Sequence, residues 1–121
     1  MSGVAAKTQR FPKSARLRKR PEFVKVQDRG SKVSTDCLLA LYLPNEGQTR
    51  LGLTVSSKVG NAVLRNRVRR RLRELFRAQR GSLPKGIDLV LIARPAAAQA
   101  DFDTLARAFS KIRQELTRRL P

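Results

Sequence analysis

The stretch KVGNAVLRNRVRRRLRELFRAQR, residues 58–80, predicts a long amphipathic helix. At about 100° per residue, its apolar side chains fall within an arc of about 120° and form a core-facing stripe: Leu64, Val68, Leu72, Leu75 and Phe76. Five arginines fall together on a separate arc of about 100°, which we call the arginine ridge: Arg69, Arg70, Arg73, Arg77 and Arg80. We expect one face of this helix to pack on the rest of the fold and the other to meet a partner.

Acidic side chains of the same helix cannot neutralise the charge of the arginine ridge, because Glu74 is the only acid in residues 58–80. Arginine carries a planar fork that grips phosphate with two hydrogen bonds. Arg65 and Arg67 lie in the first turns, where the positive end of the helix dipole also favours phosphate. Asn66 between them either holds the local geometry or contacts the nucleic acid. The stretch therefore predicts a nucleic-acid-binding face, since a solvated surface helix would pair its bases with acids one turn away.

The charge of the whole chain points the same way. Its 121 residues include 27 Lys+Arg against 9 Asp+Glu, for a net charge of +18. Residues 1–32 and 58–80 each carry +8, and the stretch between them is close to neutral and apolar. Two basic blocks around an apolar stretch indicate a folded domain that binds a polyanion. Aromatic residues are 5% of the chain and form no recognisable stacking motif, so we expect contacts with phosphates and RNA shape rather than base-by-base readout.

The absence of histidine excludes histidine-dependent catalysis and histidine metal ligands. The single cysteine, Cys37, excludes an intramolecular disulfide and is expected to be a small buried apolar residue. The longest apolar run, residues 37–43, is too short to cross a bilayer, and no secretory signal is visible. We expect a cytoplasmic protein with no membrane partner, and with no catalytic or metal-binding residues of its own.

Further elements are predicted on both sides of the helix over residues 58–80, which we call the arginine helix. A helix is predicted from Pro21 to about Arg29, with Gly30 ending it in a left-handed conformation. Strand-forming runs cover residues 33–43, 50–57 and 87–93.

The two ends of the chain differ in pattern. Asp101 is expected to cap a final helix whose apolar positions are Leu105, Phe109, Ile112, Leu116 and Leu120. Residues 1–15 lack periodicity and are expected to form a flexible basic segment before a single domain over residues 16–121.

The run Lys58–Arg70, with Arg65-Asn66-Arg67 at its centre, closely resembles the signature of the bacterial ribonuclease P protein subunit family. Other similar segments follow in the family's order over roughly residues 11–120: Phe11-Pro12, Arg16-Leu17, Glu22-Phe23, Leu51-Gly52-Leu53 and Asp88–Pro95. The resemblance implies an α+β fold, an α/β sandwich of a four-stranded mixed sheet with three helices. It also implies a left-handed βαβ crossover around the arginine helix (ribosomal protein S5 domain 2-like).

The resemblance further implies a subunit of an endoribonuclease that removes the 5′ leader from precursor tRNA. The RNA subunit would hold the catalytic centre, with Mg²⁺ bound mainly by that RNA and the substrate, and the protein would assist. The expected partners are the ribonuclease P RNA subunit and precursor tRNA with its 5′ leader, and no DNA is expected.

Two sets of site residues carry over from the resemblance. The residues expected to bind the RNA subunit are Lys58, Arg65, Asn66, Arg67, Arg69, Arg70 and Arg73. Those expected to line a cleft for the single-stranded leader are Phe23, Leu39, Leu41, Thr54 and Lys58. For Phe23 and the two leucines a core role is the alternative, because an aromatic ring packs as readily as it stacks on a base.

Two other functions compete with this assignment. One is a basic ribosomal or RNA-chaperone protein that binds structured RNA without cleavage, although it would not need the full signature over residues 58–73. The other, an independent nuclease, is disfavoured because the nine acids are scattered along the chain.

Overall fold

A computed structural model describes residues 13–120 of the chain. Its four strands are β1 (Ser31–Ser34), β2 (Leu38–Pro44), β3 (Arg50–Thr54) and β4 (Ile87–Ala93). Its three long helices are α2 (Arg20–Arg29), α3 (Ala62–Gln79) and α4 (Phe102–Arg119). Three short 3-10 turns complete the fold: η1 (Lys13–Ala15), η2 (Arg80–Ser82) and η3 (Pro95–Ala98). None of the described helices combines the length and hydropathy needed to cross a membrane.

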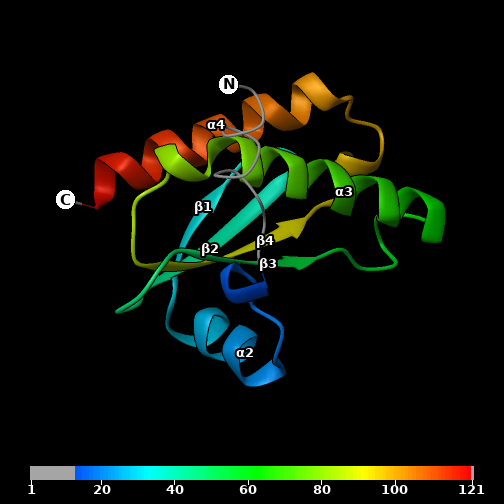
Figure 1. Ribbon diagram of the computed structural model, residues 1–121. Coiled ribbons are helices and arrows are strands. Elements are labelled where there is room, and N and C mark those ends of the chain that lie inside the picture. Colours follow the sequence, from blue (N-terminus) through cyan, green and yellow to red (C-terminus); the bar gives the residue numbers. More distant parts are fainter. Residues whose placement is uncertain (1–12, 121) are drawn as a thin grey trace.

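The four strands form one mixed sheet in the order β1-β2-β4-β3. β2 pairs antiparallel with both β1 and β4, whereas β3 and β4 are parallel. Helices α3 and α4 cover one face of the sheet and α2 lies against the other (Figure 1). Viewed from the α3 side with the strands pointing up, β4 lies to the left of β3, so the β3–α3–β4 crossover is left-handed. The α+β sandwich implied by the resemblance is confirmed.

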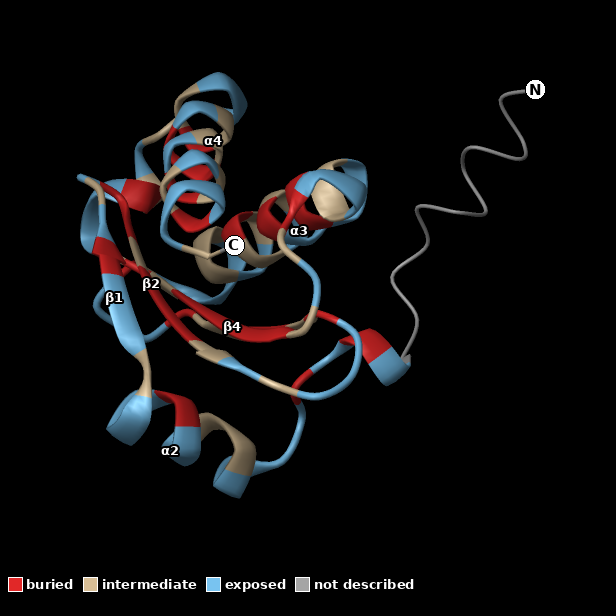
Figure 2. Ribbon diagram, turned by 90° about the vertical axis from the view of Figure 1, so that its left-hand side faces the viewer, coloured by how far each residue is buried: buried red, intermediate tan, exposed pale blue. Residues whose placement is uncertain are grey.

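The core has one part on each face of the sheet (Figure 2). The larger part joins the sheet to α3 and α4 and contains Phe76 and Phe109, both fully buried. The smaller part joins Val26 of α2 to Leu17, Leu41 and Val90. β4 is buried along nearly its whole length because it is a central strand covered on both faces, as its continuous apolar run predicted.

The predicted strand over residues 33–43 is two strands, β1 and β2, and the single-strand prediction is wrong. A tight turn at residues 35–37 separates them. The Thr35 hydroxyl accepts a hydrogen bond from the Leu38 N–H at 3.0 Å and donates to the Leu38 carbonyl at 3.1 Å. A threonine side chain thus supplies the turn that glycine or proline more often marks. Cys37, within this turn, is buried as expected.

Gly30 ends α2 in an extended conformation, with φ −77° and ψ 159°, so the predicted left-handed ending is wrong. Close packing explains the glycine instead. A Cβ at this position would lie 2.4 Å from the Val26 carbonyl oxygen and 2.8 Å from that of Tyr42. The glycine therefore lets the end of α2 lie directly on β2.

The start of the described chain is packed rather than separate from the domain. Ala15 in η1 is fully buried, although residues 13–15 fall in the segment expected to be flexible. The rest of that segment, residues 1–12, lies outside the described residues. The ordered domain therefore includes η1.

An ion-pair network ties the first turn of α2 to the sheet. The Arg50 guanidinium donates two hydrogen bonds of 2.9 Å to the Asp88 carboxylate and one of 2.8 Å to Glu22. The Lys19 N–H donates to Glu22 and lowers the pKa of its carboxyl below the ordinary value, with a further contribution from Arg50. Asp88 raises the pKa of Arg50. The stabilisation from Glu22 is thus present at neutral pH and is lost as the pH falls through its lowered pKa.

Candidate nucleic-acid interface

Helix α3 packs into the core through its apolar stripe, as the sequence predicted. Asn61 caps its start by accepting a hydrogen bond from the Leu64 N–H at 3.0 Å. Four of the five stripe residues are buried, and Leu64 in the first turn is half-buried; the buried ones are Val68, Leu72, Leu75 and Phe76. This packing fixes which way the arginines of the opposite arc face.

The arginine ridge divides into free and anchored members. Arg70, Arg73 and Arg77 are exposed along α3. Arg69 and Arg80 are half-buried and are held by hydrogen bonds, Arg80 to the Gln48 side chain at 2.7 Å. The ridge is therefore a solvent-facing row of cations that is fixed in place at both ends.

Arg65 and Arg67 are half-buried in the first turns of α3. The Nε atom of each is buried and has no hydrogen-bond partner among residues 13–120. A buried donor without a partner costs about 1–3 kcal/mol. Neither guanidinium group forms an ion pair in the described structure, so both charges remain free to attract an anionic ligand.

Asn66 has a definite structural role. Its side-chain carbonyl accepts a hydrogen bond from Arg69 Nη1 at 3.1 Å, and Arg69 Nη2 donates to the Val55 carbonyl at 3.3 Å. Of the two alternatives for Asn66, holding local geometry is the one these contacts support. Arg69 in turn links α3 to the chain that leaves β3.

A cleft lies beside Phe23, where α2 faces the edge strand β3. It comprises two cavities of about 260 and 470 Å³, and we call them together the Phe23 cleft. Both cavities are lined by Arg18, Phe23, Leu53 and Arg69, and Arg73 lines the smaller one. The arginine helix and the predicted leader cleft, which the sequence presented as two surfaces, therefore meet at Arg69.

Three cations of this cleft were missed by the sequence-based prediction. Arg16 lines the smaller cavity, Arg20 the larger one and Arg18 both. The available signal was the alternation Arg16-Leu17-Arg18, in which Leu17 is buried and its neighbours are exposed. Arg16 and Leu51 form a parallel bridge beside β3, and this bridge brings the basic N-terminal block to the arginine helix.

The predicted leader-cleft residues do not all share one surface. Phe23 and Thr54 line the Phe23 cleft. Leu39 is half-buried and lies in the same cross-strand row of the sheet as Thr54, with Ile92 between them. Leu41 is only 4% exposed, packs against Val26 of α2 and lines neither cavity, and this burial favours its alternative core role. Lys58 is exposed after β3 and lines neither cavity.

Metal-ligating side chains do not gather in the described part of the chain. Within residues 13–120, no three residues among Asp, Glu, Cys and His lie close enough together to hold an ion.

Gly52→Ala is expected to disturb the Phe23 cleft. A Cβ at Gly52 would lie 2.6 Å from an edge carbon of the Phe23 ring and 3.1 Å from the Leu17 Cβ. The ring must move, at a cost of about 1–2 kcal/mol in the free energy of unfolding. Urea denaturation measures the loss, and the NMR shifts of the ring protons report the displacement. Gly47→Ala is the matched control, because nothing lies within 4 Å of its Cβ position. Equal stability of the two variants would contradict this close packing.

Comparison with known proteins identifies the family. The ribonuclease P family model matches residues 11–117. A ribonuclease P protein component from Citrifermentans bemidjiense is 46% identical over 110 residues, covering 87% of this chain and 94% of that protein. A ribonuclease P protein component from Desulfatibacillum aliphaticivorans is 39% identical over 103 residues, covering 84% and 87%.

Solved structures agree with the sequence relatives. The RNase P protein of Staphylococcus aureus superposes with a TM-score of 0.77 at 29% identity, covering 82% of this chain and 92% of that one. The RNase P protein of Thermotoga maritima gives a TM-score of 0.76 at 31% identity, covering 83% and 96%. The arginine helix, the mixed sheet and the two sets of relatives lead to one assignment: the chain belongs to the ribonuclease P protein component family.

Proposed function

We propose that this chain binds the catalytic RNA subunit of ribonuclease P and the 5′ leader of precursor tRNA, and so assists removal of the leader. The observation that carries the proposal is the meeting of the arginine helix with the Phe23 cleft at Arg69. The RNA subunit on the arginine helix and the leader in the Phe23 cleft could then lie on one continuous basic surface. The ribonucleoprotein would act in the cytoplasm.

The arginine helix is the proposed site for the RNA subunit. Arg65 and Arg67 supply guanidinium groups with unmet hydrogen-bonding capacity, and Arg70 supplies an exposed charge beside them. Such contacts are made to phosphates, so they favour a folded RNA over a particular base sequence.

The Phe23 cleft is the proposed path of the leader. Phe23 offers a half-buried aromatic surface for a base, while Arg18 and Arg69 offer cations for the flanking phosphates. Aromatic stacking combined with backbone neutralisation suits single-stranded RNA of any sequence. Magnesium in this proposal is bound by the RNA subunit and the substrate, where it would promote phosphodiester hydrolysis.

Reconstitution tests the proposal. The chain is added to a bacterial ribonuclease P RNA at low magnesium and near-physiological salt. It is expected to restore cleavage of precursor tRNA, because its arginines and lysines neutralise RNA phosphates that metal ions would otherwise have to neutralise. Affinity of the complex for leader-bearing substrate is expected to exceed its affinity for leaderless tRNA. Absence of stimulation would reject the assignment in favour of a basic protein that binds RNA without a role in cleavage. Equal affinity for the two substrates would reject the leader path.

A further inference from the structure

A groove of about 640 Å³ lies between β1 and α4, and we call it the β1–α4 groove. β1 and β3 are the two edges of the sheet, so the groove is at the opposite edge from the Phe23 cleft. Three strand spacings, about 14 Å in all, separate these edges. No residue lines both the groove and the cleft. No residue of α3 lines the groove either, so it is a surface distinct from both the Phe23 cleft and the arginine helix.

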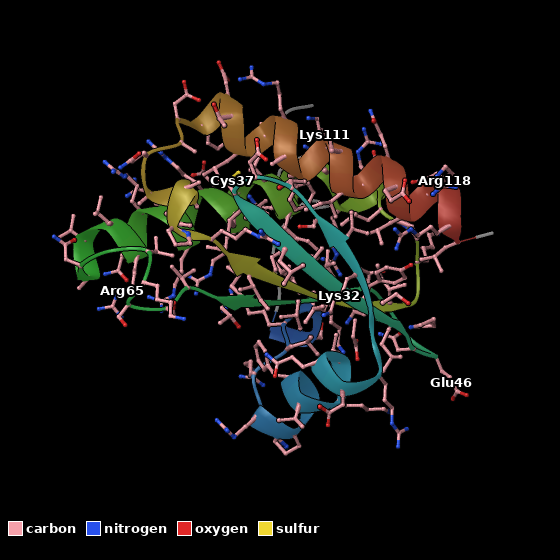
Figure 3. The ribbon with its side chains drawn as sticks, turned by 180° about the vertical axis from the view of Figure 1, so that it is seen from behind. Lys32, Cys37, Glu46, Arg65, Lys111 and Arg118 are labelled. Carbon is pink, nitrogen blue, oxygen red and sulfur yellow. The ribbon has the colours of Figure 1, made fainter. Side chains whose placement is uncertain are left out.

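One wall of the groove is a basic face of α4. Lys111 follows Arg107 by four residues on this helix and Arg119 follows Lys111 by eight, and all three line the groove. Arg107 and Lys111 are exposed, and neither forms an ion pair with an acid in the described structure. Lys111 lies along α4 and Lys32 on the neighbouring strand β1 (Figure 3). Arg107 and Lys111, which have no acidic partner in the described structure, are available to a ligand.

The acids of the groove do not neutralise this face. Glu115 is engaged by Arg118 and by Arg119, whose Nε lies 2.7 Å from the carboxylate. Hydrogen bonds from Arg118, and then from Arg119, lower the pKa of Glu115 to about 2, so it stays charged and paired. Asp36 is the other acid that lines the groove. Arg107 and Lys111 thus outnumber the one acid that is not already paired.

The other wall is the free edge of β1. The Lys32 carbonyl accepts a hydrogen bond from Arg119 Nη1 at 2.9 Å, which shows that the backbone of this residue faces α4. In an antiparallel pair, alternate residues turn both backbone groups away from the partner strand. The N–H groups of Lys32 and Ser34 therefore point to the same free edge. Arg119 also covers part of this edge, which disfavours addition of another strand there.

We propose that the β1–α4 groove binds the phosphodiester backbone of RNA, as a second contact surface on the opposite edge of the sheet from the Phe23 cleft. The nature of the ligand as RNA rests on the proposed function. Cationic side chains and backbone N–H groups are the donors that proteins use for phosphates. Val33, Cys37 and Ala108, the apolar residues of the lining, are only 8%, 3% and 7% exposed. A peptide would find little apolar surface there, so an acidic peptide fits the groove less well than RNA.

Charge removal in the groove tests the proposal. Arg107→Gln combined with Lys111→Gln, in the full chain, is expected to reduce the slope of log affinity against log salt for a bacterial ribonuclease P RNA by about two. Lys25→Gln with Lys85→Gln removes the same charge from exposed positions outside the groove and the cleft, and should leave the slope unchanged. Circular dichroism of each variant shows whether the fold is retained.

The possible outcomes separate the groove from the proposed function. A groove variant that behaves like its control, while Arg65→Ala with Arg67→Ala binds weakly, would overturn the groove and leave the proposed function standing. Groove-dependent binding of a polyglutamate peptide, with RNA binding unchanged, would also overturn it. The unaltered chain could instead fail to bind ribonuclease P RNA but bind a ribosomal RNA fragment, with the groove variant reducing the salt slope by about two. That result would support the groove and reject the proposed function. Binding to neither RNA would reject both.

Discussion

Asp88→Ala is expected to lower the free energy of unfolding by about 3 kcal/mol. Asp88 is 7% exposed and accepts two hydrogen bonds from Arg50 and one from Asn45. Its removal leaves the half-buried Arg50 guanidinium with Glu22 as its remaining acidic partner. Urea denaturation measures the loss directly, and the thermal midpoint should fall by about 10 °C.

Asp36→Ala is the matched control for this prediction. It changes the net charge by the same amount, but Asp36 is exposed and forms no ion pair in the described structure. Its effect on stability should stay within about 0.5 kcal/mol. Similar losses in the two variants would mean that net charge, rather than the Arg50 network, sets the stability.

The network matters for the site as well as for stability. Glu22 stands next to Phe23 in α2, so the Arg50 contacts help to fix the ring over β3. The sequence showed these groups only as separate segments, Glu22-Phe23, Arg50 and Asp88. Their meeting depends on the parallel pairing of β3 with β4, which places Arg50 opposite Asp88. No local pattern in the sequence predicts that β3 pairs with β4.

Elements with strong internal periodicity were predictable from the sequence. The apolar stripe of α3, the continuous apolar run of β4 and the Asp101 cap of α4 each depend on local interactions. The break between β1 and β2 was not predictable in this way, because the Thr35 side chain makes the turn within an otherwise strand-like run. Leu39 and Leu41 show the same limit in the site. They share a sheet face, and only the position of α2 decides that Leu41 is buried.

Replacing Arg65 and Arg67 together with alanine is expected to weaken binding to ribonuclease P RNA by about 100-fold. The estimate assumes the loss of two charge-assisted contacts of about 1.5 kcal/mol each. The slope of log affinity against log salt should also fall by about two, because two phosphate contacts disappear. Filter binding at a series of salt concentrations measures both quantities. Lys25→Ala with Lys85→Ala is the control, since it removes equal charge elsewhere on the surface.

The stability of the free protein distinguishes a binding role from a structural one. The Nε atoms of Arg65 and Arg67 are buried without partners, so their removal breaks no hydrogen bond at those atoms. The thermal midpoint of the double variant should therefore equal or exceed that of the unaltered chain, because two unmet donors are lost. A lower midpoint together with an unchanged salt slope would make both arginines structural. An unchanged midpoint with a reduced slope would assign both arginines to RNA binding rather than to the stability of the fold.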